Sequence, residues 1–192
     1  MTHILKSIFQ FVFFLAALPL ITLFWLTPPT LKKSMFIGIS QLISLLPGKT
    51  GSYFRNSFFN KTMKKCCNNG VIYFGTLFSD PDTEIYDNVY IGPQCNIGKS
   101  IIGKDTLIAS GVHILSGKNQ HDFSDLNTPI QQQGGEYQKI TIGEDCWIGN
   151  TAVVMANVGN KAIVAAGSIV ITDVPEYAIV AGNPAKIIRM RQ

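Results

Sequence analysis

Residues 140–170 read ITIGEDCWIGNTAVVMANVGNKAIVAAGSIV, and here an aliphatic residue followed by a small one returns about every six positions. A spacing of six matches neither an α-helix nor a simple two-sided strand. It is typical of a hexapeptide β-helix, in which each short straight segment forms one side of a triangular coil. The pattern therefore predicts a mainly β domain over residues 69–184, built of stacked coils. The pairs that set the pattern are Ile91-Gly92, Ile97-Gly98, Ile102-Gly103, Ile108-Ala109, Ile142-Gly143, Ile148-Gly149 and Val164-Ala165.

The N-terminal part of the chain has a different composition. Residues 8–26 are apolar except for Gln10, Pro19 and Thr22, and a run of about 19 residues is long enough to cross a bilayer core. No signal-peptidase site follows the run, so we expect a retained transmembrane anchor in residues 1–30 rather than a cleaved secretory signal. Pro19 also allows a re-entrant hairpin, and the sequence leaves the two open.

A second apolar-rich stretch, residues 31–46, is interrupted by lysines and serines. This stretch is more typical of an amphipathic helix at the membrane interface than of another span. We therefore expect residues 31–68 to form a basic amphipathic helical linker.

Charge divides the chain at about the same place. Residues 1–79 carry eight Lys and Arg and no Asp or Glu, whereas residues 80–192 carry eight basic and twelve acidic residues. The positive-inside rule then predicts the inner membrane, with the β-helix facing the cytoplasm. The cations also suit anionic lipid headgroups in contact with residues 1–65. A nucleic-acid partner is disfavoured, because the basic residues alternate with Phe, Leu and Met beside the apolar run.

The cysteines favour a reducing compartment and no metal site. Cys66 and Cys67 are adjacent, and Cys95 and Cys146 occupy repeat positions where a small apolar residue would serve. No CxxC pair occurs and the spacing fits no zinc site, so we expect four reduced structural thiols.

These motifs together identify a family resemblance. Residues 85–189 resemble the hexapeptide-repeat acyltransferases, which fold as a left-handed parallel β-helix. Within that group they resemble the galactoside, maltose and serine O-acetyltransferases and the membrane-anchored polysaccharide O-acetyltransferases. The matching stretches are IGPQCNIG (91–98), HILSGKNQHDFSDLNTPIQQQGG (113–135), KITIGEDCWIGNTAVVMANVG (139–159) and AIVAAGSIVITDVPEYAIVAGNPAKIIR (162–189).

The resemblance implies an O-acetyltransferase that moves acetyl from acetyl-CoA to a sugar hydroxyl of a surface polysaccharide or a lipid-linked glycan precursor. It also implies a homotrimer, with each active site between two chains. An acetyltransferase of a small soluble acceptor (serine, a free sugar or an antibiotic) is the alternative enzyme, and a non-catalytic β-helix scaffold is a further alternative. Attachment to a membrane favours a lipid-linked acceptor over a soluble one.

The repeat is interrupted once, and we expect the chemistry there. Between Ile114 and Ile140 a polar loop, residues 115–139, is extruded, and functional groups of solenoids gather on such insertions. His121 in this loop matches the family's general base, since histidine titrates near neutral pH and can take a hydroxyl proton and return it. Asp122 or Asp125 is expected to orient the imidazole.

The other two histidines and the loop glycines are assigned lesser roles. His3 precedes the apolar run and is out of range, and His113 should point away from the core because Ile114 points inward. His113 then either lines a cleft or decorates the outside. Gly134-Gly135 is expected to be a flexible turn that returns the loop to the β-helix wall.

Acetyl-CoA as a co-substrate is also implied by the resemblance. In the family it lies in the groove between neighbouring β-helices, against the late coils and the C-terminal tail, here residues 185–192. The matching positions are Asn150, Ala166, Lys186, Arg189 and Trp147. Trp147 is either a wall of the acetyl pocket or a partly buried coil residue.

The sequence departs from the family's pattern twice at this expected site. Ile171-Thr172 stands where relatives often carry Thr-Lys, and Lys186 replaces an arginine found in some of them. Arg191 is a candidate to compensate for the lost cation.

Overall fold

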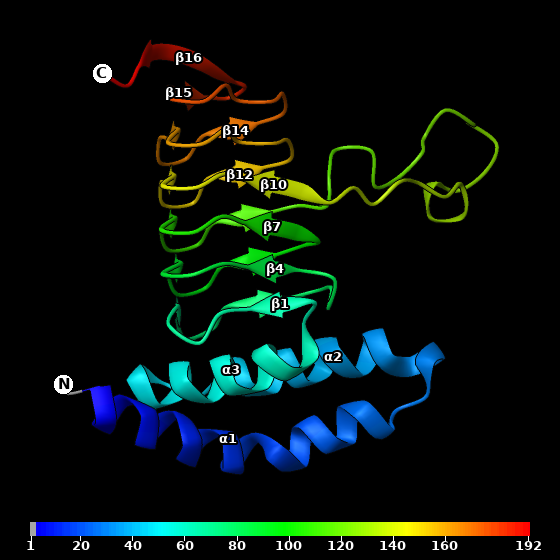
Figure 1. The fold of residues 1–192 in the computed structure, drawn as a ribbon. Coiled ribbons are helices and arrows are strands. Elements are labelled where there is room, and N and C mark those ends of the chain that lie inside the picture. The colour runs from blue at the N-terminus through cyan, green and yellow to red at the C-terminus, as the bar shows by residue number, and fades with distance from the viewer. Residues whose placement is uncertain (1–2) are drawn as a thin grey trace.

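The computed structural model describes residues 3–192, with side chains from residue 7 onward. Its main body is a parallel β-helix with three faces (Figure 1), which confirms the predicted fold class. The first sheet contains β1 (Lys65–Cys66), β4 (Glu84–Ile85), β7 (Ser100–Ile102) and β10 (Ile140–Ile142). The second contains β2 (Val71–Ile72), β5 (Tyr90–Ile91), β8 (Leu107–Ile108), β11 (Trp147–Ile148), β13 (Ile163–Val164), β15 (Ala178–Gly182) and β16 (Ala185–Met190). The third contains β3 (Leu77–Phe78), β6 (Asn96–Ile97), β9 (His113–Ile114), β12 (Val153–Val154) and β14 (Ile169–Val170).

The repeat pair explains how the coils stack. Its aliphatic member points inward, and Ile91, Ile108 and Ile148 are all fully buried in one ladder of the second sheet. Its small member lies against the next coil: a Cβ built on Gly149 would come 2.4 Å from the backbone nitrogen of Ala166. Each buried isoleucine contributes roughly 2–3 kcal/mol of apolar burial, so the repeat supplies both the core and the close contact between coils.

Three helices lie across the end of the β-helix next to β1 (Figure 1). They are α1 (His3–Leu26), α2 (Pro29–Ser44) and α3 (Gly48–Thr62), and we call them the helical base. A cluster of aromatic rings joins the three helices to β3, with Phe24, Phe36, Phe58, Phe59 and Phe78 all buried. The segment expected as a linker is thus a packed layer that covers the open end of the core.

Arg55 on α3 secures the junction between the base and the first coil. Its side chain is fully buried and donates hydrogen bonds to the carbonyl oxygens of Ile43 (3.0 Å), Leu46 (2.7 Å) and Ile72 (3.0 Å). Burial lowers its pKa to about 10, so the guanidinium stays charged at neutral pH. A cation at the last carbonyls of α2 satisfies acceptors that the helix itself leaves unpaired.

The C-terminal residues and the cysteines complete the fold. β16 folds back antiparallel on β15, so most of the basic tail 185–192 is a strand at the far end of the second sheet. Arg191 after it donates hydrogen bonds to the carbonyls of Lys161 (3.0 Å) and Asp145 (3.3 Å). The four cysteines are free and buried, as expected, and burial raises the pKa of each thiol.

Candidate active site

The extruded loop leaves the β-helix after β9 and returns at β10 (Figure 1). Its two arms are joined by backbone hydrogen bonds at three levels: Gln138 N–H to Ser116 (2.9 Å), Glu136 N–H to Asn119 (2.8 Å) and Asp122 N–H to Gly134 (3.1 Å). A short 3-10 helix, Ile130–Gln132, turns the chain near the tip. The loop therefore has a paired neck, which holds His121 on the outgoing arm opposite the returning one.

Gly135 is in close contact with the backbone at His121. Its φ is +146°, and a Cβ built there would come 2.1 Å from the carbonyl oxygen of Gln120 and 2.8 Å from the nitrogen of His121. Only a residue without a side chain fits such an approach. Gly135 is thus a tight contact beside the candidate base, and the glycine pair expected to turn the chain also places the returning arm against His121.

His121 lines an open cavity of about 500 Å³ at the neck of the loop. The other lining residues are Asn119, Asp122, Phe123, Ser124, Gly135 and Glu136. The exposed imidazole is accessible to a substrate, and two carboxylates share the cavity with it. Glu136 was missed by sequence reasoning, because it lies fifteen positions after His121 in the chain and only the pairing of the two arms brings it to the same cavity.

The carboxylate of Asp125 is hydrogen-bonded within the turn at the loop tip. It accepts hydrogen bonds from Thr128 Oγ1 (2.6 Å) and from the N–H of Asn127 (2.9 Å), and these bonds lower its pKa. The residue therefore closes the turn at the loop tip. Asp122, at the cavity itself, is the better placed of the two predicted orienting carboxylates.

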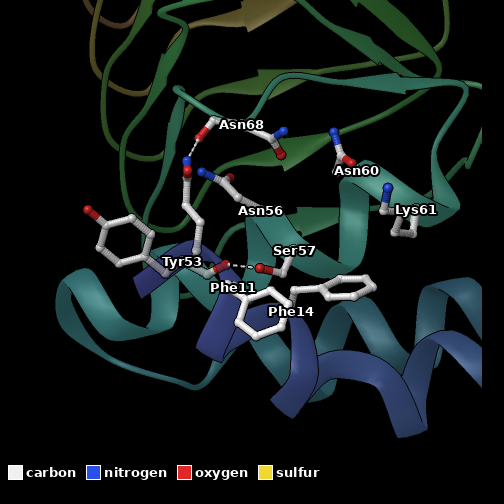
Figure 2. Close-up of a pocket in the computed structure, with 9 residues that line it drawn as sticks. Phe11, Phe14, Tyr53, Asn56, Ser57, Asn60, Lys61 and Asn68 are labelled. Carbon is white, nitrogen blue, oxygen red and sulfur yellow. Dashed lines mark hydrogen bonds between the residues drawn. The ribbon is translucent and has the colours of Figure 1, made fainter. Parts of the chain in front are cut away.

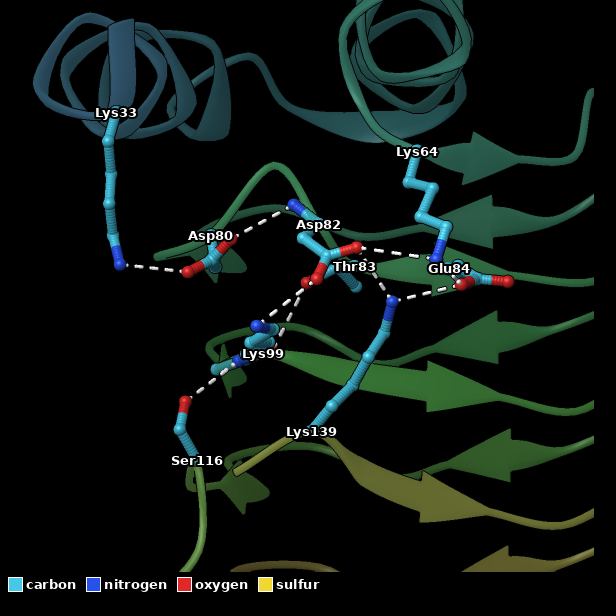
Figure 3. Close-up of polar contacts among 10 residues, drawn as sticks. Lys33, Lys64, Asp80, Asp82, Thr83, Glu84, Lys99, Ser116 and Lys139 are labelled. Atoms are coloured by element: carbon cyan, nitrogen blue, oxygen red, sulfur yellow. Dashed lines mark hydrogen bonds and ion pairs between the residues drawn. The ribbon is translucent and has the colours of Figure 1, made fainter. Parts of the chain in front are cut away.

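A network of ion pairs anchors the returning arm to the rest of the protein (Figure 3). Lys139, the last loop residue, lies 2.9 Å from both Asp82 Oδ1 and Glu84 Oε1. Lys64, just after α3, lies 3.0 Å from Glu84, and Lys99 lies 3.2 Å from Asp82. Hydrogen bonds from Lys139 are the main reason that the pKa values of both carboxyls are lowered. The position of the loop is thereby coupled to the helical base.

His113 is not among the residues that line this cavity, and its side chain points away from the core, as predicted. It points outward from β9, is exposed, and stands between Asn96 and Val153 on the neighbouring coils of the third sheet.

The residues expected to hold coenzyme A lie elsewhere on the surface. Asn150 and Ala166 are exposed at the corner between the second and third sheets, where Gly167 N–H donates to the carbonyl of Asn150 (2.8 Å). Trp147 faces outward on β11 and is 52% exposed. Lys186 and Arg189 are exposed on β16 of the same sheet.

Within one chain, His121 and the residues expected to hold coenzyme A lie apart. The loop with His121 leaves from the corner between the third and first sheets, so the width of the third sheet separates it from Asn150 and Ala166. Arg191, the candidate to replace the lost cation at the cofactor site, also pairs with Asp145 at 3.6 Å. Its guanidinium is therefore engaged by neighbouring coils.

Comparison with known proteins identifies the family. No protein-family model matches the chain. It is 34% identical over 167 residues to a Saccharomyces cerevisiae protein named "Putative acetyltransferase", across 83% of this chain and 81% of that protein. It is also 34% identical over 122 residues to the "Putative lipopolysaccharide biosynthesis O-acetyl transferase WbbJ" of Escherichia coli K12, across 60% of this chain and 61% of that protein. A chloramphenicol acetyltransferase of Klebsiella aerogenes is 35% identical over 134 residues, 62% of each chain.

The fold has a counterpart among solved structures. A galactoside acetyltransferase in complex with coenzyme A superposes with a TM-score of 0.62 at 21% identity, over 87% of this chain and 84% of that one. The chain spans only about three-fifths of the WbbJ and chloramphenicol relatives, but it aligns with most of the yeast protein. Such identity over most of both chains, on a β-helix with the predicted repeat, makes this protein a member of the hexapeptide-repeat acetyltransferase family.

Proposed function

We propose that this acetyltransferase moves an acetyl group from acetyl-CoA to a sugar hydroxyl of a lipid-linked glycan or surface polysaccharide precursor, with His121 as general base. The observation that carries the proposal is the exposed imidazole of His121 in the cavity at the loop neck. Within an acetyltransferase, an accessible imidazole beside two carboxylates has the chemistry that deprotonation of a hydroxyl requires.

The reaction is a direct transfer. His121 takes the hydroxyl proton while the acceptor oxygen attacks the thioester carbonyl, and a backbone N–H stabilises the oxyanion that forms. The C–S bond then breaks, and the imidazolium returns the proton to the departing thiolate of coenzyme A. Asp122, or Glu136 on the opposite arm, orients the ring and stabilises its charged form.

We assign the coenzyme A site to the positions expected from the resemblance: Asn150, Ala166, Lys186, Arg189 and Trp147. The complex of the galactoside acetyltransferase with coenzyme A supports this donor. Lys186 and Arg189 provide exposed cations for its phosphates. Since this corner and the loop are separated by a full face of the β-helix, His121 of one copy would serve coenzyme A bound by another, which supports the expected homotrimer.

A glycan acceptor fits the N-terminal half of the molecule better than a soluble one. Residues 1–79 are basic without a single acidic residue, and within the described part of α1, Ser7–Leu26 has the length and apolarity of a membrane segment. We therefore propose attachment to the inner membrane, with the β-helix on the cytoplasmic side where acetyl-CoA is available. The chloramphenicol acetyltransferase relative keeps a small-molecule acceptor as the second candidate.

The test is mass spectrometry of the host's lipid-linked and surface glycans, with wild-type protein compared with His121→Ala and with His113→Ala as the matched control. We expect one glycan to lose an acetyl increment in the His121 variant alone, at equal abundance of all three proteins. An unchanged glycan profile would reject the polysaccharide acceptor, and purified enzyme would then be assayed for release of coenzyme A with serine, free sugars and antibiotics.

A further inference from the structure

Helix α1 has two apolar faces, and they have different surroundings. One face packs into the helical base, with Ala17, Ile21 and Phe24 buried. The opposite face is exposed from the first turn of the described side chains to the end of the helix, at Ile8, Phe11, Val12, Leu15, Leu18, Leu23 and Leu26. A soluble surface does not expose an apolar stripe of this length without a partner that covers it.

Two polar side chains of α1, one toward each end of its described part, donate hydrogen bonds to the body of the protein. Near the start, Gln10 Nε2 donates a hydrogen bond to the carbonyl oxygen of Asn68, just after β1 (2.8 Å). Near the end, Trp25 Nε1 donates to the carbonyl oxygen of Lys61 (3.1 Å). In a helix crossing the bilayer, Gln10 would lose this acceptor and lie in or near hydrocarbon, where an unpaired amide is unfavourable.

Aromatic contacts hold α1 along the length between these two bonds. The rings of Phe9 and Phe13 stack on Tyr53 of α3, with centroids 6.1 and 5.9 Å apart, and Phe24 packs edge-on against Phe36 and Phe58. A spanning geometry would require α1 to swing away from α3 and expose all of these surfaces.

The seam between α1 and the first coil has the polarity of a headgroup region. A cavity of about 250 Å³ runs there, and Asn56, Asn60, Asn68 and Lys61 line it together with Phe11 and Phe14 (Figure 2). Asn56 Oδ1, buried in this seam, has no hydrogen-bond donor within the described residues. Amides and a lysine therefore border the apolar face of α1, an arrangement that suits a helix lying at the depth of the lipid headgroups.

The positive charge of the helical base favours an anionic membrane surface. Lys32 lies 4.1 Å from the ring centroid of Trp25, and Lys61 lines the cavity of the seam. Lys49 lines a second cavity, which Tyr53 of α3 also lines, and residues 1–79 contain no acidic residue. Lysines and a tryptophan at the rim of an apolar face are typical of proteins that bind anionic membrane interfaces.

We propose that the helical base docks in the plane of an anionic membrane surface, with α1 lying along the interface against α3 instead of crossing the bilayer. The proposal rests on the membrane attachment proposed above and defines its geometry. It places the N-terminus on the same side of the membrane as the β-helix, and it leaves the exposed stripe of α1 in contact with acyl chains.

Crosslinking in the native membrane tests the geometry. In the full-length protein, Phe13→Cys/Tyr53→Cys should react with a short bis-maleimide to give an intramolecular crosslink, and Leu15→Cys/Tyr53→Cys, which uses the exposed face of α1, should not. A protease should remove an N-terminal epitope tag from inverted vesicles and not from intact spheroplasts. A tag cut only from the outside, with the Phe13 pair unreacted, would overturn the in-plane arrangement in favour of a span.

Glycan acetylation measured in the same cells separates this proposal from the proposed function. Loss of the crosslink with acetylation intact would reject the geometry alone. Retention of the crosslink in cells whose glycans carry no dependent acetyl group would reject the acceptor and leave the geometry standing.

Vesicle binding tests the choice of surface. We expect the full-length protein to bind vesicles containing phosphatidylglycerol, and Lys32→Ala/Lys49→Ala/Lys61→Ala to weaken that binding on the order of 100-fold at low salt. The control Lys104→Ala/Lys118→Ala/Lys161→Ala removes the same charge outside the base and should bind as the wild type does. Equal binding of all three proteins, or equal binding to neutral vesicles, would overturn the role of anionic lipid.

Discussion

The β-helix and the extruded loop are held in opposite ways. In the β-helix every coil offers an equivalent inward position, and Ile91, Ile108 and Ile148 fill it in succession. In the loop each contact occurs once: Gly135 against His121, Asp125 in its own turn, Lys139 on two carboxylates. A repeating core gives stability that does not depend on the loop, and the loop is therefore free to carry chemistry. Substitutions should accordingly separate into those that change stability and those that change activity.

The largest effect is expected at His121. The change His121→Ala should lower kcat by about 1,000-fold, because general base catalysis by a positioned side chain typically contributes 10²–10⁴-fold. The midpoint of thermal unfolding should stay where it is in the wild type, since the imidazole is exposed. Steady-state release of coenzyme A measures kcat, and thermal unfolding measures the midpoint. The control His113→Ala should keep the activity of the wild type, and if His121→Ala is equally active, His121 has no part in the mechanism.

A substitution in the core of the β-helix, Ile148→Ala, should change stability and leave activity almost unchanged. It should lower the free energy of unfolding by about 3 kcal/mol, through lost burial and the cavity left behind, with little effect on kcat of the folded fraction. Ile101→Ala is the matched control, because Ile101 is the outward, partly exposed residue of β7. Denaturant unfolding of both variants makes the comparison, and equal losses would contradict the assignment of the inward ladder.

Gly135→Ala should affect activity through geometry alone. The added Cβ must displace the Gln120–His121 peptide, and misplacement of a catalytic group by about 1 Å can lower the rate roughly 100-fold. Gly134→Ala has the same kind of left-handed backbone, but its Cβ meets only Asp122 Oδ2 at 3.9 Å. A larger loss of kcat for Gly135→Ala than for Gly134→Ala is the expected result, and similar losses would mean that backbone strain, not contact with His121, is responsible.

The smallest effect is expected for Lys139→Gln. Removing its partly buried ion pairs should lower the free energy of unfolding by about 1 kcal/mol at neutral pH. Hydrogen bonds from Lys139 hold the pKa values of the Asp82 and Glu84 carboxyls in the folded protein below their usual range. Their contribution is therefore present above about pH 5 and is lost as the pH falls through the lowered pKa values. The wild type should thus lose more stability than the variant between about pH 5 and 3, and parallel pH profiles would contradict the role of the network.

Sequence alone was sufficient for the regions where the structure is local or periodic. The six-residue repeat predicted the β-helix, the inward ladder and the outward position of His113, because each coil is built like its neighbour. The interruption of the repeat bounded the loop, and the family resemblance led to His121. The enzyme class followed from motifs that lie within the repeat and the loop.

Only the tertiary structure decided the contacts between segments that share no periodicity. The pairing of the loop arms brought Glu136 to the cavity of His121 and put Gly135 against its backbone, and the turn at the tip engaged Asp125. The burial of Arg55 on the last carbonyls of α2 and the hydrogen bond from Gln10 to Asn68 pack the N-terminal helices against one another and against the first coil. Sequence could not supply these, because a repeat specifies only its neighbouring coil, whereas a contact made once depends on where the whole chain has folded.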